Sequence, residues 1–257
     1  MLLAADVGNT EIVVGVFEGP RLQQTWRLST RSERTSDELT LALAGFLAQH
    51  GIAFETDVTG LVVASVVPDV TAAFREMATH AFAFAPVLVG PGTRTGVPIL
   101  TDNPREVGAD RVVNTLATFT KFGGPAIVVD FGTATNFDIV SANGEFVGGV
   151  IAPGMQASAA SLFSRTARLT RVELTAPASV IGKSTVEAIQ SGLIFGTAGE
   201  VDAIVTRIKR ELGEAIVVAT GGLAPVVLPH CHTVDHHEPW LTLEGLRLVF
   251  EKNPADV

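Results

Sequence analysis

The sequence predicts an α/β protein made of two similar halves. Two segments follow one pattern: an apolar strand that ends in Asp, a turn of the form Asp-x-Gly, and a returning strand. In the first copy Leu2–Ala5 leads to Asp6, and in the second the run Val128–Ile139 contains Asp130 and Gly132. The copies lie about half the chain apart, a period too long for a solenoid and typical of a duplicated domain. Strands and helices alternate between the copies, which indicates an α/β fold.

In the first half, apolar runs predict strands at Leu2–Ala5, Ile12–Phe17, Leu22–Leu28, Leu61–Val67 and Val87–Val89. Thr35 and Glu38 form a capping box that predicts the start of a helix, and Pro68 begins another helix. The tetrapeptide Gly108–Arg111 opens a third helix. Because the helix dipole favours an acid in a first turn, Asp110 has a structural explanation beside any functional one.

The second half begins with the hairpin that contains Asp130, followed by glycine-rich segments at Gly148–Gly149 and Ala152–Gly154 that predict a loop. Further predicted elements are a helix over Ala157–Leu169, a long helix after Ser184, a strand at Ile216–Ala219 and a helix over Leu241–Phe250. Ser184 and Glu187 form a second capping box, and Gly196 and Gly199 are candidate break points in the long helix. Thr220-Gly221-Gly222 follows the strand and leaves room for a flat ligand near the backbone.

Composition narrows the class of protein. The chain has 257 residues, of which 47% are hydrophobic and 18% charged, enough apolar side chains for a large core. The net charge of −9 argues against a general nucleic-acid or membrane-surface role. The N-terminus lacks the basic region of a signal peptide, no apolar run is long enough to span a bilayer, and a single Cys fits a reducing compartment. We therefore expect a cytoplasmic protein that binds neither nucleic acid nor membrane.

Two motif-like segments have simpler explanations. Gly182-Lys183-Ser184 resembles the end of a Walker A loop, but Pro177 stands where that motif needs its first glycine. A local cluster of histidines around Cys231 matches no zinc spacing, so a surface loop is the favoured interpretation over a metal site. Neither segment therefore provides a predicted site.

Three carboxylates beside glycine turns are the candidate chemical groups: Asp6, Asp110 and Asp130. Phosphoryl transfer needs positioned phosphates, a cation that spreads negative charge, and a carboxylate that accepts the proton of the attacking hydroxyl. A single Asp-x-Gly turn is more often an ordinary hairpin, but the repetition favours two elements that bind a nucleotide and a divalent cation. The same groups would also suit a switch that hydrolyses ATP without a second substrate.

Six segments together resemble the type III pantothenate kinase family, within the superfamily of acetate and sugar kinases, heat-shock chaperone ATPases and actin. They occur in the family's order along almost the whole chain: Asp6–Thr10, Asn103–Arg111, Asp130–Thr135, Gly149–Gly154, Ile181–Thr185 and Ala219–Gly222. The resemblance implies duplicated actin-like (ribonuclease H-like) domains at residues 1–118 and 119–257, with mixed central sheets, flanking helices and a nucleotide cleft between the domains. It also implies a transferase that uses ATP to convert pantothenate to 4′-phosphopantothenate, the first step of coenzyme A biosynthesis.

The resemblance also implies a role for each matching residue. The first phosphate-binding element would comprise Asp6, Val7, Gly8, Asn9, Thr10, Glu11, Ile12 and Val13, with Asp6 near Mg²⁺-bound phosphates. Pantothenate would contact Gly108, Ala109, Asp110 and Arg111, and Asp110 would be the catalytic base. Asp130 would hold a monovalent cation, K⁺ or NH₄⁺, and Thr133 would contact ATP. Thr185 would reach the pantothenate site, potentially across the interface of a homodimer.

One position departs from the family pattern. The family usually has Tyr just before the Asp/Asn-Pro pair of the substrate loop, whereas Thr101 stands there and the chain contains no Tyr. The smaller side chain would lose contact area with pantothenate. Two alternatives to the kinase are also open at this point: a nucleotide-binding transcriptional regulator, and a catalytically silent relative with the same fold.

Overall fold

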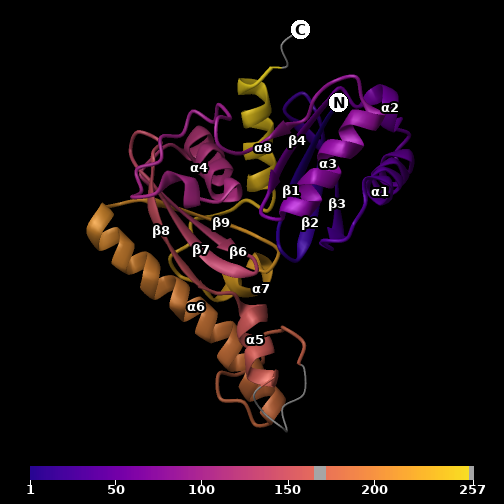
Figure 1. Ribbon diagram of the computed structural model, residues 1–257. Helices are drawn as coiled ribbons and strands as arrows, with labels where there is room; N and C mark the ends of the chain where they lie inside the picture. Colours follow the sequence, from indigo (N-terminus) through magenta and orange to yellow (C-terminus); the bar gives the residue numbers. More distant parts are fainter. Residues whose placement is uncertain (165–171, 255–257) are drawn as a thin grey trace. The chain divides into compact units, whose positions relative to one another are not determined.

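A computed structural model gives the fold of residues 1–164 and 172–254 (Figure 1). The chain forms two compact units. The first comprises residues 1–97, 102–117 and the C-terminal segment from Leu241, and the second comprises residues 98–101 and 118–240. The predicted helix over Ala157–Leu169 is present as α5 (Met155–Ser164), and residues 165–169 lie outside the described part of the chain. The domain division at residues 118 and 119 stays a prediction.

The first unit is built on a mixed sheet with the strand order β3-β2-β1-β4-β5. The strands are β1 (Leu2–Val7), β2 (Glu11–Glu18), β3 (Arg21–Ser29), β4 (Gly60–Ser65) and β5 (Val87–Leu88). The hairpin strands β1, β2 and β3 are antiparallel, whereas β4 pairs with β1 and β5 in parallel. β1 and β4 are almost wholly apolar and buried, as expected for central strands with both faces covered.

The second unit repeats this topology. Its sheet has the order β10-β9-β6-β7-β8, so β6 and β7 correspond to β1 and β2, and β9 corresponds to β4. The strands are β6 (Ala126–Phe131), β7 (Ala134–Val140), β8 (Phe146–Pro153), β9 (Ile216–Thr220) and β10 (His236–His237). Both units have an antiparallel hairpin at the duplicated Asp-x-Gly turn and a parallel partner on its other side. The predicted duplication of an α/β domain is therefore confirmed.

Helices flank both sheets. In the first unit they are α1 (Ser36–Ala48), α2 (Phe54–Asp57), α3 (Pro68–Ala81) and α8 (Leu241–Lys252), and a short 3₁₀ helix covers Pro104–Glu106. α4 (Ala109–Phe122) begins in the first unit and ends in the second. The second unit has α5, α6 (Thr185–Leu212), α7 (Ala224–Val227) and a 3₁₀ turn at Leu228–His230. Each unit has its own apolar core, centred on Leu3 and Phe74 in the first and on Ile127 and Phe137 in the second.

The region around Gly148 corrects one prediction. The segments Gly148–Gly149 and Ala152–Gly154 were expected to form a loop, but residues 146–153 form the edge strand β8. Phe137 of β7 pairs with Val150, and Ile139 pairs with Gly148 at a register shift where Gly148 has a φ of +144°. Glycine is therefore needed at this bulge for its backbone freedom, and the ladder to β7 determines the strand.

Local capping signals in the sequence are reliable at two helix starts. Thr35 and Glu38 form a reciprocal capping box at α1, and Ser184 and Glu187 form one at α6. α6 runs without interruption past Gly196 and Gly199. Among the described residues, no helix is long and apolar enough to cross a lipid bilayer.

Candidate active site

Asp6 lies near the end of β1, where the first unit carries its Asp-x-Gly turn. It pairs with Val13 of β2 on one side and with Ala64 of β4 on the other. The turn closes with a hydrogen bond from the Gly8 N–H to the Glu11 carbonyl at 3.0 Å. Asn9 and Thr10 are exposed at its tip. Backbone N–H groups of a turn can form an anion-binding concavity, and phosphate binding at this turn stays a prediction.

Thr30, which the sequence analysis did not single out, holds this turn in place. Its hydroxyl donates to the Gly8 carbonyl at 2.7 Å, and its N–H donates to the Thr10 carbonyl at 2.9 Å. Thr30 follows the last residue of β3, which pairs with Glu11 of β2. The β2–β3 pairing thus continues past the strand ends and ties the turn to the segment after β3.

Asp130 occupies the corresponding place in the second unit. It pairs with Asn136 of β7 and with Thr220 of β9, the last residue before Gly221-Gly222. Gly221 has a φ of +95°, and a Cβ there would lie 2.5 Å from the Asp130 carboxylate oxygen Oδ1. The glycine therefore allows the Thr-Gly-Gly turn to approach Asp130 closely, which places two of the predicted motifs side by side.

The turn after Asp130 is equally tight. The Gly132 N–H donates to the Ala134 carbonyl at 3.0 Å, and Thr133 is exposed at the tip. A Cβ at Gly154, just after β8, would lie 2.3 Å from the Thr133 carbonyl oxygen and 2.7 Å from that of Gly132. Three glycine-containing segments of the second unit, Gly132, Gly154 and Gly221, thus surround one carboxylate and its turn.

Asp110 lies in the first turn of α4, in the same unit as Asp6. Burial is the largest influence on its carboxyl and raises its pKa above the ordinary value, while its own N–H, the N–H of Arg111 and the Arg111 charge act in the opposite direction. A Cβ at Gly108 would collide with the Asp110 carboxylate. The glycine before α4 therefore allows the carboxylate to turn back over the start of its own helix.

Thr185 is the first residue of α6 and is exposed. The N-terminal part of α6 packs on α5 and on the segment before the helix, through hydrogen bonds from Gln190 to the Glu173 carbonyl and from Ser191 to the Val180 carbonyl. The second unit thus contains Asp130, Thr133 and Thr185, and the first contains residues 6–13 and Gly108–Arg111. The cleft predicted between the domains stays a prediction.

The histidine-rich segment has a structural explanation. The Asp202 carboxylate accepts hydrogen bonds from the His232 N–H and from the N–H and hydroxyl of Thr233, at distances between 2.8 and 3.1 Å. His236 stacks on Phe122, with ring centroids 4.6 Å apart. No group of three or more His, Cys, Asp or Glu side chains in the described residues is arranged to hold a metal ion. The surface-loop interpretation is wrong for part of this segment, because His230 ends a 3₁₀ turn and His236–His237 form the edge strand β10 beside β9.

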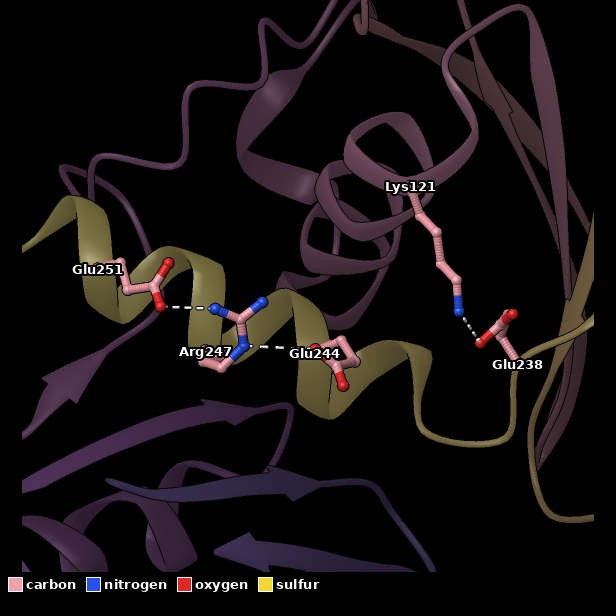
Figure 2. A network of polar contacts seen from close by, with 5 residues as sticks. All are labelled: Lys121, Glu238, Glu244, Arg247 and Glu251. Atoms are coloured by element: carbon pink, nitrogen blue, oxygen red, sulfur yellow. Dashed lines mark hydrogen bonds and ion pairs between the residues drawn. The ribbon is translucent and has the colours of Figure 1, made fainter. Parts of the chain in front are cut away.

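Ion pairs fasten the ends of α4 and α8. The Lys121 ammonium contacts the Glu238 carboxylate at 2.6 Å near the end of α4, and Arg247 of α8 contacts Glu244 and Glu251 of its own helix (Figure 2). Within the first unit, Gly245 of α8 lies so close to α4 that a Cβ there would be 2.2 Å from the Val113 carbonyl oxygen. The Lys121–Glu238 pair and the close approach of Gly245 to Val113 hold α4, the helix that carries Asp110, whereas the Arg247 pairs lie within α8.

A separate cavity of about 570 Å³ lies in the second unit against α6. Its walls are mainly apolar side chains of β7, β8 and α6, with Arg207 and Glu211 among the lining residues. None of the predicted site residues lines it. It therefore plays no part in the candidate active site.

Comparison with known proteins identifies close relatives. The family model described as type III pantothenate kinase matches residues 2–207. Type III pantothenate kinase from Frankia casuarinae is 58% identical over 255 residues, covering 98% of this chain and 100% of the relative. The enzyme of that name from Acidothermus cellulolyticus is 57% identical over 255 residues, with 98% and 99% coverage.

Solved structures agree on the fold. The activator of 2-hydroxyisocaproyl-CoA dehydratase from Clostridium difficile, solved with bound ADPNP, aligns with a TM-score of 0.59 and 13% identity over 98% of this chain and 94% of that one. The polyphosphate/ATP-glucomannokinase from an Arthrobacter species aligns with a TM-score of 0.51 and 12% identity, with 98% and 99% coverage. These likenesses show that both units have the actin-like fold of sugar kinases and related ATPases.

Proposed function

Because the chain belongs to the type III pantothenate kinase family, we propose that Asp110 is the catalytic base of that family's reaction. The protein is a phosphotransferase that uses ATP to phosphorylate pantothenate to 4′-phosphopantothenate in coenzyme A biosynthesis. The regulator and the silent relative are not favoured by these matches. The observation that carries the assignment of the base is the position of Asp110 in the first turn of α4 directly after the close-packed Gly108, where burial raises its pKa.

The proposed reaction moves one proton and one phosphoryl group. The primary hydroxyl of pantothenate gives its proton to the Asp110 carboxylate, and its oxygen attacks the γ-phosphorus of ATP. The bond from that phosphorus to the β–γ bridging oxygen breaks, and ADP leaves with the electron pair. A carboxyl whose pKa is raised by burial is a stronger base than an exposed one, which suits this role.

The two hairpins are proposed to hold the nucleotide. Residues 6–13 form the first phosphate-binding element, supported by the exposed tip at Asn9 and Thr10, and Thr133 contacts ATP from the second hairpin. Asp6 lies near Mg²⁺-bound phosphates in this proposal. Mg²⁺ commonly takes only one or two carboxylates from the protein and the remaining ligands from phosphates and water, so a single carboxylate fits.

Asp130 is proposed to hold the monovalent cation, K⁺ or NH₄⁺. The residues present suit such an ion, since the carboxylate lies beside turns whose glycines bring backbone atoms close to it. Oxygen atoms of carboxylates and carbonyls are the ligands that a hard cation prefers. When bound, the cations would offset the negative charge of the phosphates, and Asp130 would keep its ion beside the hairpin.

Pantothenate is proposed to bind at Gly108, Ala109, Asp110 and Arg111. The Arg111 guanidinium lowers the pKa of Asp110 through its charge, which shows that the two side chains lie in one electrostatic environment. The Thr101 hydroxyl is buried without a hydrogen-bond partner among the described residues. We infer that Thr101 replaces only part of the contact that Tyr makes in the family.

A cytoplasmic homodimer completes the proposal. Several exposed apolar side chains of the second unit lie on α5, on α6 and on the segment before α6: Leu162, Val180, Ile181 and Val186. In Figure 1, α5 and the start of α6 extend together away from the sheet of their own unit. Exposed apolar side chains on a projecting element favour an interface with a second copy, and Thr185 would then reach the pantothenate site of the partner.

One assay tests the activity. ADP release by the purified protein is measured with ATP and Mg²⁺, with and without pantothenate, in potassium and then in sodium buffer. We expect turnover that needs pantothenate and is faster in potassium. If ADP forms at the same rate without pantothenate, the kinase assignment fails. Equal rates in the two buffers would contradict only the proposed role of Asp130.

A further inference from the structure

We propose that Arg34 is a phosphate ligand of the ATP site, in addition to the hairpin residues. The inference rests on the proposed function, because it assigns a further residue to the same nucleotide site. Arg34 lies in the segment between β3 and α1, which the family motifs do not include. Three observations carry the proposal: the hydrogen bonds that join this segment to the first hairpin, the bond from the guanidinium to the Ser29 carbonyl, and the lack of an acceptor for the Arg34 Nε.

The segment is fastened directly to the first hairpin. Thr30 bonds to the carbonyls of Gly8 and Thr10, at 2.7 and 2.9 Å. Residues 31–34 then form a turn, closed by a bond from the Arg34 N–H to the Arg31 carbonyl at 3.2 Å. Arg34 therefore follows, after one closed turn, the residue that is bonded to the proposed phosphate-binding tip.

The guanidinium of Arg34 folds back onto the end of β3. Its Nη2 donates to the carbonyl of Ser29 at 3.1 Å, and Ser29 is the residue that pairs with Glu11 at the start of β2. This bond fixes the guanidinium at the end of the β2–β3 ladder, beside the turn. An arginine placed in this way presents its remaining N–H groups in a rigid fork, which matches a phosphate group.

One of those N–H groups is buried and unsatisfied. The Arg34 Nε has no hydrogen-bond partner within the part of the chain that the structure describes, although the atom is shielded from solvent. Arg34 also makes no ion pair with any carboxylate of the described residues. A buried cationic donor without an acceptor is costly, so its retention beside a nucleotide-binding turn points to an anionic ligand. The phosphate oxygens of ATP have the required charge and acceptor geometry.

Arg31 offers a matched control. It has the same charge, lies in the same turn and is exposed. Replacing either arginine by Gln changes the long-range field of the protein equally. Only Arg34→Gln removes the directed bond to phosphate, so a difference between the two variants reports that bond.

The test measures nucleotide binding and turnover in parallel. Calorimetric titration without pantothenate gives the dissociation constants for ATP, ADP and adenosine, and the assay gives KM for ATP and for pantothenate. We expect Arg34→Gln to weaken ATP binding about ten- to a hundred-fold, the effect of losing a charge-assisted hydrogen bond. Binding of adenosine and the KM for pantothenate should change less than about twofold, and Arg31→Gln should match the wild type within the same margin. Arg34→Lys should fall between, because Lys supplies charge without the fork.

Several outcomes overturn the proposal. If Arg34→Gln binds ATP as tightly as the wild type, Arg34 is not a phosphate ligand. If the variant loses ATP and adenosine affinity equally, Arg34 acts only on the local structure through its bond to Ser29. An equal effect of Arg31→Gln would show a long-range charge effect instead of a contact. If the wild type binds ATP but does not turn over pantothenate, the kinase assignment fails while the titrations still decide the role of Arg34. If the wild type binds no ATP, both fail.

Discussion

At the scale of single residues, Asp110 has two explanations that are compatible. The helix dipole and the N–H groups of the first turn favour its charge, whereas burial opposes it and is the stronger influence, so that its pKa is raised. Folding therefore favours the protonated form. Once it ionises, the carboxylate is destabilised by its surroundings, which is the usual trade between stability and activity at a catalytic group.

Replacement of Asp110 by Asn tests this trade. Asn keeps the shape of the side chain but removes the base, so we expect turnover to fall by about 10²- to 10⁴-fold. The melting temperature at neutral pH should be equal to or above that of the wild type, because no buried charge remains. This gain should shrink as the pH falls through the raised pKa of the folded state and should disappear below the ordinary value of 3.8, where the wild-type carboxyl becomes protonated in both the folded and the unfolded state. Near-normal turnover would mean that another group is the base.

The pH dependence of kcat/KM tests the influence of Arg111 on the same group. The base must be ionised, so activity should rise with pH through a pKa that is above the ordinary Asp value. The charge of Arg111 lowers this pKa, so Arg111→Met should move the acid limb to higher pH. The profile is measured at saturating ATP with pantothenate varied. The matched variant Arg105→Met, on the exposed 3₁₀ turn before α4, should leave the limb in place. An unchanged limb in Arg111→Met would contradict the assignment.

The sequence gives no signal for residues that lie beside the site only because of strand pairing. Asp6, Asp110 and Asp130 were recognisable because each lies in a short motif with glycine nearby. Thr30 and Arg34 lie in no such motif. Thr30 contacts the turn only because β3 pairs with β2, and Arg34 is placed near the turn by its bond to Ser29, the last residue of β3. Their importance depends on the register of two strands, which local patterns leave open.

At the scale of elements, strands and helices with strong local signals were predicted closely. The capping boxes located the starts of α1 and α6, and the apolar runs located β1, β4, β6 and β9. β8 was missed because its glycines are typical of loops, whereas its pairing with β7 is a tertiary effect. The close contact of the Gly132–Thr133 turn with Gly154 is a tertiary effect of the same kind, because Gly154 follows β8 and lies outside the hairpin.

Gly154→Ala tests whether this close approach shapes the second hairpin. The added methyl group would meet the backbone oxygens of Thr133 and Gly132, which cannot move without opening the turn. We expect the melting temperature to fall, because inserting one methyl group into a packed site typically costs about 1–3 kcal/mol. ATP affinity should fall as well, because Thr133 would shift. Gly45→Ala on α1, where nothing lies near the new methyl group, is the control and should not destabilise the protein. Wild-type stability and ATP affinity of Gly154→Ala would show that the turn has room.

At the scale of the whole molecule, the two sheets have the same strand order although the sequence copies share only a short pattern. The order β3-β2-β1-β4-β5 recurs as β8-β7-β6-β9-β10, and each central hairpin ends in an Asp-x-Gly turn. The sequence predicted this duplication from the two turns alone. It could not predict that α8, at the end of the chain, would pack on β1 and β4 of the first unit, because no local signal encodes such a return.

The proposed homodimer leads to a test of oligomeric state. Ile181 is 81% exposed on the projecting segment, and Leu41 is 78% exposed on α1 of the other unit. We expect the wild type to have the mass of a dimer by light scattering after size-exclusion chromatography. Ile181→Asp should shift it toward the monomer, because a charge at an apolar interface loses its hydration, and Leu41→Asp should not. A monomeric wild type would contradict the proposal.

Complementation between two inactive variants decides whether Thr185 acts across the interface. Asp110→Asn lacks the base, and Thr185→Trp should block the pantothenate site with a bulky side chain at the exposed start of α6. If each site combines Asp110 of one chain with Thr185 of the other, a mixed dimer contains one site with both native residues.

Mixing the two variants and allowing subunit exchange should then restore activity, up to about one quarter of the wild-type value, since half of the dimers are mixed and each has one intact site. If both residues of a site come from the same chain, every site in the mixture carries a substitution, and no activity returns. Native mass spectrometry, which verifies that mixed dimers have formed, makes that second result a contradiction of the shared site.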